Sequence, residues 1–276
     1  MRRIRVTVAV LFVVGARFTH AQQEPKLKRT EVVVIADLSD RIHPGYHPGQ
    51  IARDTAILHI ISDEFGNVVK KNRYLFSRDR LRTLYVGGEN PPTEPRVDVA
   101  RMNEDHRVVV RELAQELKEF NAQAIRPYLT ERKKYEGADL WSWFRNSAPV
   151  VLRVNDPARV IHTRIIILTD GYLEFDPSIK REPGTAMRMA FLRGRADWEK
   201  LYPLYKLAPV GHTLPNTRVL LLELAPLRPE RNTTEQDILE RYWTDWFQAM
   251  GVEAEFVTNK EAMPSVRDAV KQFLSR

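Results

Sequence analysis

Three almost wholly aliphatic runs constrain the fold of this chain more than any other feature. They occupy residues 32–35, 165–168 and 219–224. A strand with one face in water alternates apolar and polar residues, whereas a continuous run predicts a strand buried on both faces. Such strands are typical of a parallel sheet covered by helices, and a fourth core strand is expected at 252–257.

Amphipathic patterns predict helices between these strands. Leu58, Ile61 and Phe65 would share one face of the first helix, and Pro127 should kink or break a long helix that starts near Asp105. Further helices are expected at 233–249, opened by a capping box of Thr233 with Gln236, and after Ser265. Tyr74–Phe76 and Leu81–Val86 are expected to be two further strands, joined by a short turn.

This order of elements predicts an α/β fold, an open, mostly parallel, doubly wound (Rossmann-like) sheet with helices on both faces. The chain has 276 residues and is 43% hydrophobic, which suits one domain at 31–276. Residues 173–216 show no clear period and are interpreted as an insertion, with one helix near 196–201.

The first 21 residues predict export. A basic stretch, Met1–Arg5, precedes an apolar run, 6–16, which is too short to span a bilayer, and a small residue, Ala21, suits cleavage. We expect a signal peptide at 1–21 and a polar tether at 22–30, with no transmembrane segment later. Because the chain contains 0 cysteines, a bacterial periplasm or cell surface is favoured over a disulfide-forming secretory route.

The net charge of +7 does not indicate nucleic-acid binding. Four of the basic residues lie within 1–21, which contain no acid. The basic and aromatic residues of 70–82 are better explained as a charged sheet edge, and export also argues against a nucleic-acid partner.

Polar residues follow two of the aliphatic runs directly. Asp37 and Ser39 follow the first run, and Asp170 follows the second. The carboxyl ends of parallel strands meet at one edge of a sheet, where binding sites of such folds lie. These oxygen donors suit Mg²⁺, Mn²⁺ or Ca²⁺.

From about Glu31 onward, with a gap over the insertion, the chain resembles a von Willebrand factor type A (VWA) domain. The metal-ion-dependent adhesion site of that family is written Asp-x-Ser-x-Ser, with a Thr from a mid-chain loop and an Asp often within Thr-Asp-Gly. Asp37 and Ser39 match, and so does Asp170 within Thr-Asp-Gly, but Arg41 replaces the second Ser and Ala138 replaces the Thr.

The resemblance implies a binding or scaffolding module that engages another protein and is not an enzyme. With two ligand positions replaced, the site is degenerate, and metal binding should be weak or absent. We expect the Arg41 guanidinium to pair with Asp37 or Asp170 in place of a metal, while Asp40 and Asp139 could substitute as ligands.

Other interpretations stay open. Asp37, Ser39 and Asp170 could serve only ordinary turns, and Asp139 could be a helix N-cap. A metal-dependent hydrolase or phosphotransfer enzyme using Asp37 and Asp170 is the alternative function, although Ser39 stands where such enzymes need a second Asp. His43 and His47 lie in a Pro/Gly loop, for which a turn is favoured over a metal site.

Overall fold

The computed structural model describes residues 29–45, 47–72, 77–87, 94–104, 109–129, 137–152, 161–174, 182–227 and 234–276. The expected signal peptide, most of the expected tether, the expected strand at 74–76 and the proposed cap Thr233 lie outside these ranges.

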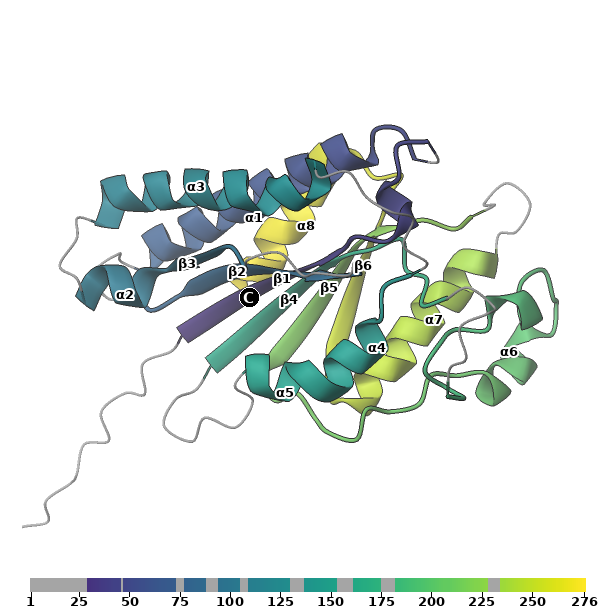
Figure 1. Cartoon of the computed structure of the whole chain (residues 1–276). Helices are drawn as coiled ribbons and strands as arrows, with labels where there is room; N and C mark the ends of the chain where they lie inside the picture. Colours follow the sequence, from purple (N-terminus) through teal and green to yellow (C-terminus); the bar gives the residue numbers. More distant parts are fainter. Residues whose placement is uncertain are drawn as a thin grey trace, which may run out of the picture.

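Six strands form one sheet in the order β3-β2-β1-β4-β5-β6 (Figure 1). The strands are β1 (Arg29–Asp37), β2 (Arg80–Val86), β3 (Arg96–Asp98), β4 (Ile161–Leu168), β5 (Thr217–Leu224) and β6 (Glu253–Thr258). All neighbouring pairs are parallel except β2 and β3. The predicted open, mostly parallel sheet is therefore confirmed.

Helices cover both faces of this sheet (Figure 1). One layer contains α1 (Gln50–Lys71), α3 (Val109–Leu129) and α8 (Met263–Ser275). The other contains α4 (Leu140–Ser142), a π-helical turn (Trp143–Ser147), α5 (Ala148–Val151) and α7 (Thr234–Ala249). The short α2 (Val99–Glu104) follows β3. Because helices cover both faces of a mostly parallel sheet (Figure 1), the chain is doubly wound.

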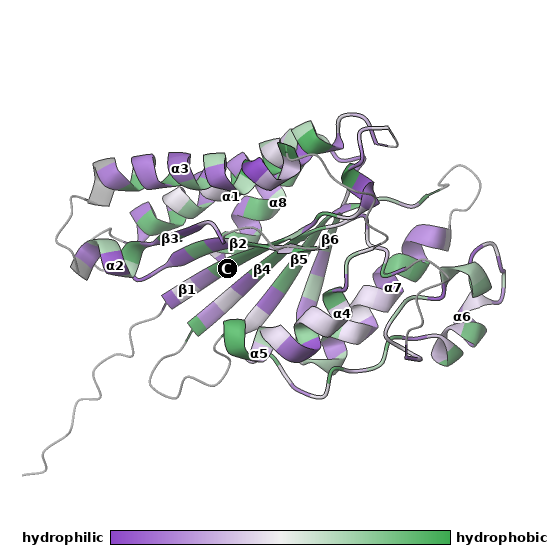
Figure 2. Ribbon diagram, viewed as in Figure 1, coloured by the Kyte–Doolittle hydropathy of each residue, from purple (hydrophilic) through white to green (hydrophobic). Residues whose placement is uncertain are grey.

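Side chains of the aliphatic runs pack against both helix layers. Val33, Ile165 and Val219 belong to the core under α4 and α7, while Val34 and Ile166 belong to the core under α1, α3 and α8. All five side chains are fully buried. Figure 2 shows the strands coloured as hydrophobic where they pass between the helix layers. Burial on both faces explains why the runs are continuous rather than alternating.

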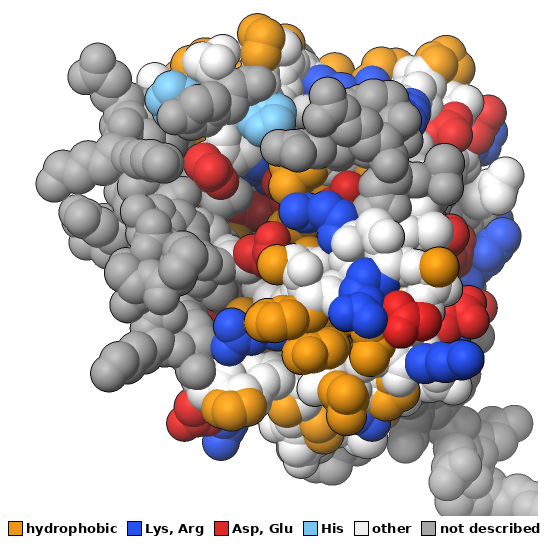
Figure 3. Space-filling view, turned by 90° about the vertical axis from the view of Figure 1, so that its right-hand side faces the viewer, with side chains coloured by type: hydrophobic (Ala, Val, Ile, Leu, Met, Phe, Trp, Pro, Cys, Tyr) orange, Lys and Arg blue, Asp and Glu red, His pale blue; other side chains and the backbone are white. Residues whose placement is uncertain are grey.

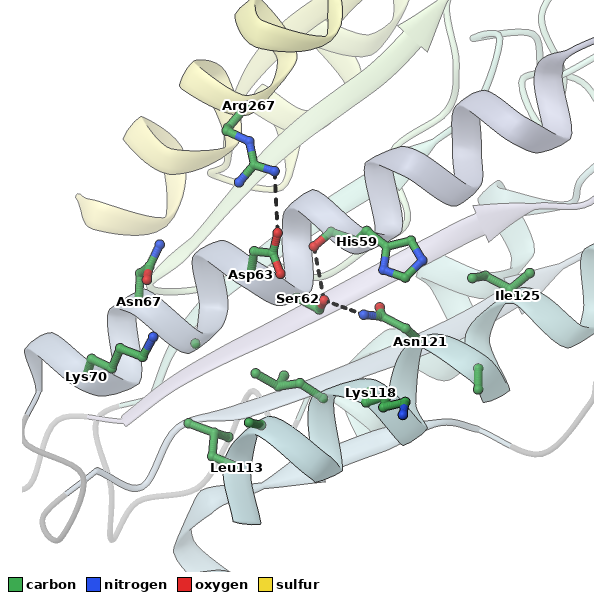
Figure 4. Close-up of a pocket in the computed structure, with 14 residues that line it drawn as sticks. His59, Ser62, Asp63, Asn67, Lys70, Leu113, Lys118, Asn121, Ile125 and Arg267 are labelled. Carbon is green, nitrogen blue, oxygen red and sulfur yellow. Dashed lines mark hydrogen bonds and ion pairs between the residues drawn. The ribbon is translucent and has the colours of Figure 1, made fainter. Parts of the chain in front are cut away.

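Side-chain contacts hold the three helices of the first layer together (Figure 4). The Asn121 amide on α3 donates to the Ser62 hydroxyl on α1 at 2.8 Å, and Arg267 on α8 pairs with Asp63 at 3.4 Å. Gly66 allows α3 to approach closely, since a Cβ there would lie 3.1 Å from Leu117. A pocket of about 980 Å³ lies among these side chains.

The described residues of the insertion contribute to the core under α4 and α7. They include 3-10 turns at Met189–Phe191 and Tyr202–Leu204, and α6 (Trp198–Leu201), which matches the helix expected near 196–201. Leu192 and Leu214 are fully buried, and the Tyr202 ring packs edge-on against Tyr242 of α7 at 5.0 Å.

Several expected boundaries are wrong. The antiparallel partner of β2 is β3, a segment for which no strand was expected. Pro127 lies within the last turns of α3 and does not break it, and Ala262 rather than Ser265 precedes α8 as its N-cap. β1 begins at Arg29, inside the expected tether.

Within the described ranges, no helix has the length and apolar character needed to cross a bilayer.

Candidate functional site

Asp37 lies at the carboxyl end of β1, beside the end of β4. Ala36 pairs with Leu168 in the sheet, which brings the Thr169 hydroxyl next to Asp37. Asp37 Oδ2 accepts a hydrogen bond from Thr169 Oγ1 at 2.9 Å, and Oδ1 accepts one from Ser39 N at 2.8 Å. The side chain is 1% exposed. The turn role expected for Asp37 is therefore real, and it fixes the carboxylate between the two strand ends.

Asp170 lies in a hydrogen-bonded turn at the same edge. Its Oδ1 accepts from Tyr172 N at 3.1 Å, and its main-chain oxygen accepts from Ala225 N after β5 at 3.0 Å. Gly171 has a φ of +97°, and a Cβ there would lie 2.4 Å from Leu224 Cδ2. Both observations require glycine, as the Thr-Asp-Gly sequence suggested. Asp170 is partly exposed, so this carboxylate can be reached from solvent.

The two carboxyl groups influence each other. Burial, and after it the charge of Asp37, raises the pKa of Asp170 to about 7. Burial also raises the pKa of Asp37, against the opposing effect of the Arg41 cation. Among the described residues, neither carboxylate forms an ion pair. The charge of Arg41 opposes the rise at both groups, but its ion pair is with Asp54, so the edge holds two acidic groups without an ion pair of their own in the described part of the chain.

The expectation that Arg41 pairs with Asp37 or Asp170 is wrong. Arg41 lies in a 3-10 turn (Asp40–Ile42), and its guanidinium binds Asp54 of α1 with both Nη atoms, at 2.7 and 3.0 Å. Toward Asp37 it donates only to the main-chain oxygen, at 3.2 Å. Both side chains of the pair are buried. Burial disfavours the charged guanidinium, but the charge and hydrogen bonds of Asp54, with a smaller contribution from the charge of Asp37, raise the pKa of Arg41.

Asp54 and Glu223 are two further acidic residues near this edge of the sheet, and our sequence analysis did not identify them. Gln50 Nε2 donates to Asp54 at 2.8 Å and to Glu223 at 3.1 Å, while Arg53 Nε contacts Glu223 Oε2 at 2.6 Å. Glu223 is 1% exposed and has a φ of +78°, at a register shift between β5 and β6. The signals were present, because Asp54 shares the apolar helix face of Leu58 and Glu223 interrupts an aliphatic run.

Asp139 and Asp40, the two expected substitute ligands, have different surroundings. Asp139 Oδ1 accepts from Ser142 N at 2.9 Å, which confirms its N-cap role, so that one of its oxygens is engaged. Asp40 is exposed and close enough to Asp170 to raise the pKa of that group. Ala138 is buried and offers no side-chain oxygen.

The two histidines of the Pro/Gly loop form a turn. His43 Nδ1 accepts from Gly45 N at 3.2 Å, and the main-chain oxygen of His43 accepts from His47 N at 2.9 Å. The predicted turn is therefore confirmed. Figure 3 views the molecule from the side on which the strands end, where histidine, acidic and basic side chains gather around a hollow.

The oxygen donors of Asp37, Ser39 and Asp170 fit a hard divalent cation, which would balance the paired carboxylates. They are too few to surround one. In the described part of the chain, no group of three or more His, Asp or Glu side chains is arranged to hold a metal ion. A cation at this edge would depend on hydroxyl groups, water and donors from outside the chain.

No family model and no curated protein matches this chain. Several solved structures are similar to this chain. One is the conserved hypothetical protein BatB from Bacteroides thetaiotaomicron, which is 13% identical in sequence. The match covers 89% of this chain and 97% of that chain, with a TM-score of 0.40. The pilus adhesin SpaC from Lactobacillus rhamnosus GG has 11% identity, 92% and 31% coverage, and a TM-score of 0.46. The minor pilin PilB from Streptococcus sanguinis has 12% identity, 91% and 60% coverage, and a TM-score of 0.42.

Proposed function

We propose that this chain is an exported, VWA-like binding module that engages another protein at the carboxyl edge of its sheet, through a divalent cation held by Asp37, Ser39 and Asp170. One observation carries the proposal. Two carboxylates far apart in the sequence, Asp37 and Asp170, lie close enough at this edge to interact, with no ion pair to either of them among the described residues.

The two carboxylates would have different roles. Asp37 is held by two hydrogen bonds and would contribute mainly charge, whereas the partly exposed Asp170 can present an oxygen outward. A carboxylate of the partner would supply a donor that Ala138 lacks. Because the chain alone offers few donors, its own affinity for Mg²⁺, Mn²⁺ or Ca²⁺ should be no better than millimolar, and the partner should strengthen it.

Calorimetric titration of the purified protein with Mn²⁺, Mg²⁺ and Ca²⁺ tests the cation. We expect weak binding by the wild type and at least tenfold weaker binding by Asp170→Asn. Asp63→Asn is a matched control, because Asp63 is an exposed residue on α1, away from this edge. Equal binding by wild type and Asp170→Asn would contradict the proposed site.

The partner is tested by immobilising the wild type and Asp170→Asn on a matrix and exposing both to native envelope extract, with Mn²⁺ or with EDTA. We expect one set of proteins to be retained only by the wild type with Mn²⁺. Retention that persists in EDTA and in Asp170→Asn would show that binding does not use this edge.

Export rests on the basic and apolar pattern of residues 1–21. Amino-terminal sequencing of the protein from its native envelope should begin at Gln22. A sequence that begins at Met1 would contradict cleavage.

A hydrolase is the second candidate, because a carboxyl group with a pKa of about 7 can both donate and accept a proton near neutral pH. We expect the purified protein to hydrolyse generic phosphoesters no faster than background in the presence of Mg²⁺ or Mn²⁺. Turnover that disappears in Asp37→Asn would favour the enzyme instead.

A further inference from the structure

A second pocket, of about 670 Å³, lies at the opposite end of the sheet, where β1 and β4 begin. Its lining includes Thr30 of β1, Arg164 of β4, Lys71 at the end of α1 and Lys271 of α8. Figure 1 shows the carboxyl terminus beside the amino ends of the central strands, and Arg276 also lines the pocket. Three different elements of the fold, β4, α1 and α8, therefore contribute cationic side chains to one cavity.

Arg164 is the unusual member of this pocket. It is 6% exposed, yet among the described residues its only hydrogen bond is a long one, from Nη1 to the main-chain oxygen of Thr163 at 3.4 Å. Its Nε is buried without a partner, and within the described ranges no carboxylate forms an ion pair with it. A buried guanidinium without an ion pair is unfavourable. Burial, and after it the charge of Arg218, lowers the pKa of Arg164, against the opposing charge of Glu255.

The acidic groups around the pocket are already engaged. Asp79 accepts from Thr30 N at 2.9 Å, Asn72 Nδ2 at 3.1 Å and Ser77 Oγ at 2.7 Å. Glu64 pairs with Arg267 at 3.2 Å. Glu255 lies close enough to act on Arg164, but it binds Arg218 at 2.5 Å and Arg276 at 3.2 Å.

A purely structural role explains only part of this arrangement. Lys71 lies in the last turn of α1, where a cation stabilises the helix dipole. Arg164 lies on a strand, and neither a helix terminus nor an ion pair accounts for it. Neither Lys71 nor Lys271 has an ion pair in the described part of the chain. Both lysines are exposed and lie around the buried Arg164 guanidinium.

We propose that this pocket binds a phosphate group, with Arg164 as the buried anchor and Lys71 and Lys271 at the rim. A guanidinium contacts phosphate oxygens with two parallel hydrogen bonds, and two further cations match a dianion better than a single carboxylate. The phosphate could be inorganic phosphate or part of an anionic lipid headgroup. This site is separate from the carboxyl edge and does not depend on a metal there.

The test compares the full chain with Arg164→Gln and with Arg195→Gln. Arg195 is a matched control because it is an exposed arginine of the insertion that pairs with Asp197. We expect sodium phosphate to raise the melting temperature of the wild type and of Arg195→Gln above that in sodium chloride of equal ionic strength. Arg164→Gln should bind phosphate at least tenfold more weakly in calorimetry. In chloride it should melt no lower than the wild type, which excludes unfolding as the cause.

The source of the phosphate is tested with vesicles of phosphatidylcholine, with and without phosphatidic acid. Cosedimentation that needs both phosphatidic acid and Arg164 would support the proposal and identify a lipid headgroup. A response to inorganic phosphate without cosedimentation would support it and identify a free phosphate. If the wild type responds to neither, or if Arg164→Gln responds as the wild type does, the proposal is wrong.

Discussion

Each end of the sheet contains a buried arginine, and the two arginines differ in whether they form an ion pair. At the carboxyl end, Arg41 is 3% exposed and makes a two-point ion pair with Asp54. At the amino end, Arg164 is 6% exposed and has no such partner among the described residues. A desolvated charge is tolerated readily only where it is paired and hydrogen-bonded. Arg41 is therefore part of the fold, whereas Arg164 is a candidate for contact with a ligand.

The same comparison applies to the acidic groups. Asp54 and Asp79 are buried and fully engaged by neighbouring donors. Asp37 and Asp170, in contrast, lie close together without an ion pair to any described residue, and the pKa of each is raised although the charge of Arg41 opposes the rise. Unbalanced charge has opposite signs at the two ends of the sheet, which favours a cation at one and an anion at the other.

The largest expected effect is at the engaged pair. Asp54→Ala would leave the buried Arg41 guanidinium without its ion-pair partner, because among the described residues Arg41 then keeps one hydrogen bond, to the main-chain oxygen of Asp37. Removing one partner of a buried pair costs about 3–5 kcal/mol. We expect a loss of that size in the free energy of unfolding, measured by urea denaturation.

The double variant Arg41→Met with Asp54→Leu is the control, because it removes both charges and keeps the apolar volume. It should recover most of the stability lost in Asp54→Ala. A double variant as unstable as the single one would mean that the pair is not the source of the loss, and the contrast with Arg164 would fail.

A smaller effect is expected for Asp170→Asn, and it should depend on pH. The pKa of Asp170 is about 7 in the folded protein, above the ordinary value of 3.8. Between these values the folded state holds a proton that the unfolded state releases, so the contribution of Asp170 to stability falls as the pH rises from about 4 to 7. Above pH 7 the folded protein contains an unfavourable carboxylate, which asparagine removes.

Since Asp170 is partly exposed, we discount the full shift and expect Asp170→Asn to be about 1–2 kcal/mol more stable than the wild type at pH 8, without divalent cations. At pH 4 the difference should vanish. Urea denaturation at several pH values measures it, and a difference that does not change with pH would show that Asp170 titrates normally.

The sheet was predictable because its signal is strong and local. Two central strands need residues that suit two apolar layers, and that requirement produces continuous aliphatic runs at 165–168 and 219–224. β3 was not predictable, since it has only three residues and is held by pairing with β2. The Ser265 cap was wrong because the helix begins earlier, with Pro264 in its first turn.

The candidate site was predictable in its location but not in its pairing. The position of Asp37 and Asp170 after parallel strands brings them to one edge whatever the loops do. The partner of Arg41 depends on how the 3-10 turn after β1 packs against α1, which is a tertiary contact. Asp54 on the apolar face of that helix was the available signal, since a buried carboxylate requires a partner.

The smallest expected effect is at the unpaired arginine. Arg164→Met removes a charge that burial and Arg218 both disfavour, while methionine keeps an unbranched apolar stem in the same space. Without an anion in the buffer, we expect this variant to be equal to the wild type or up to about 1 kcal/mol more stable, in contrast to Asp54→Ala. Urea denaturation in chloride buffer measures the difference. A loss of several kcal/mol would show that Arg164 has a structural partner and that the two ends of the sheet do not differ in this way.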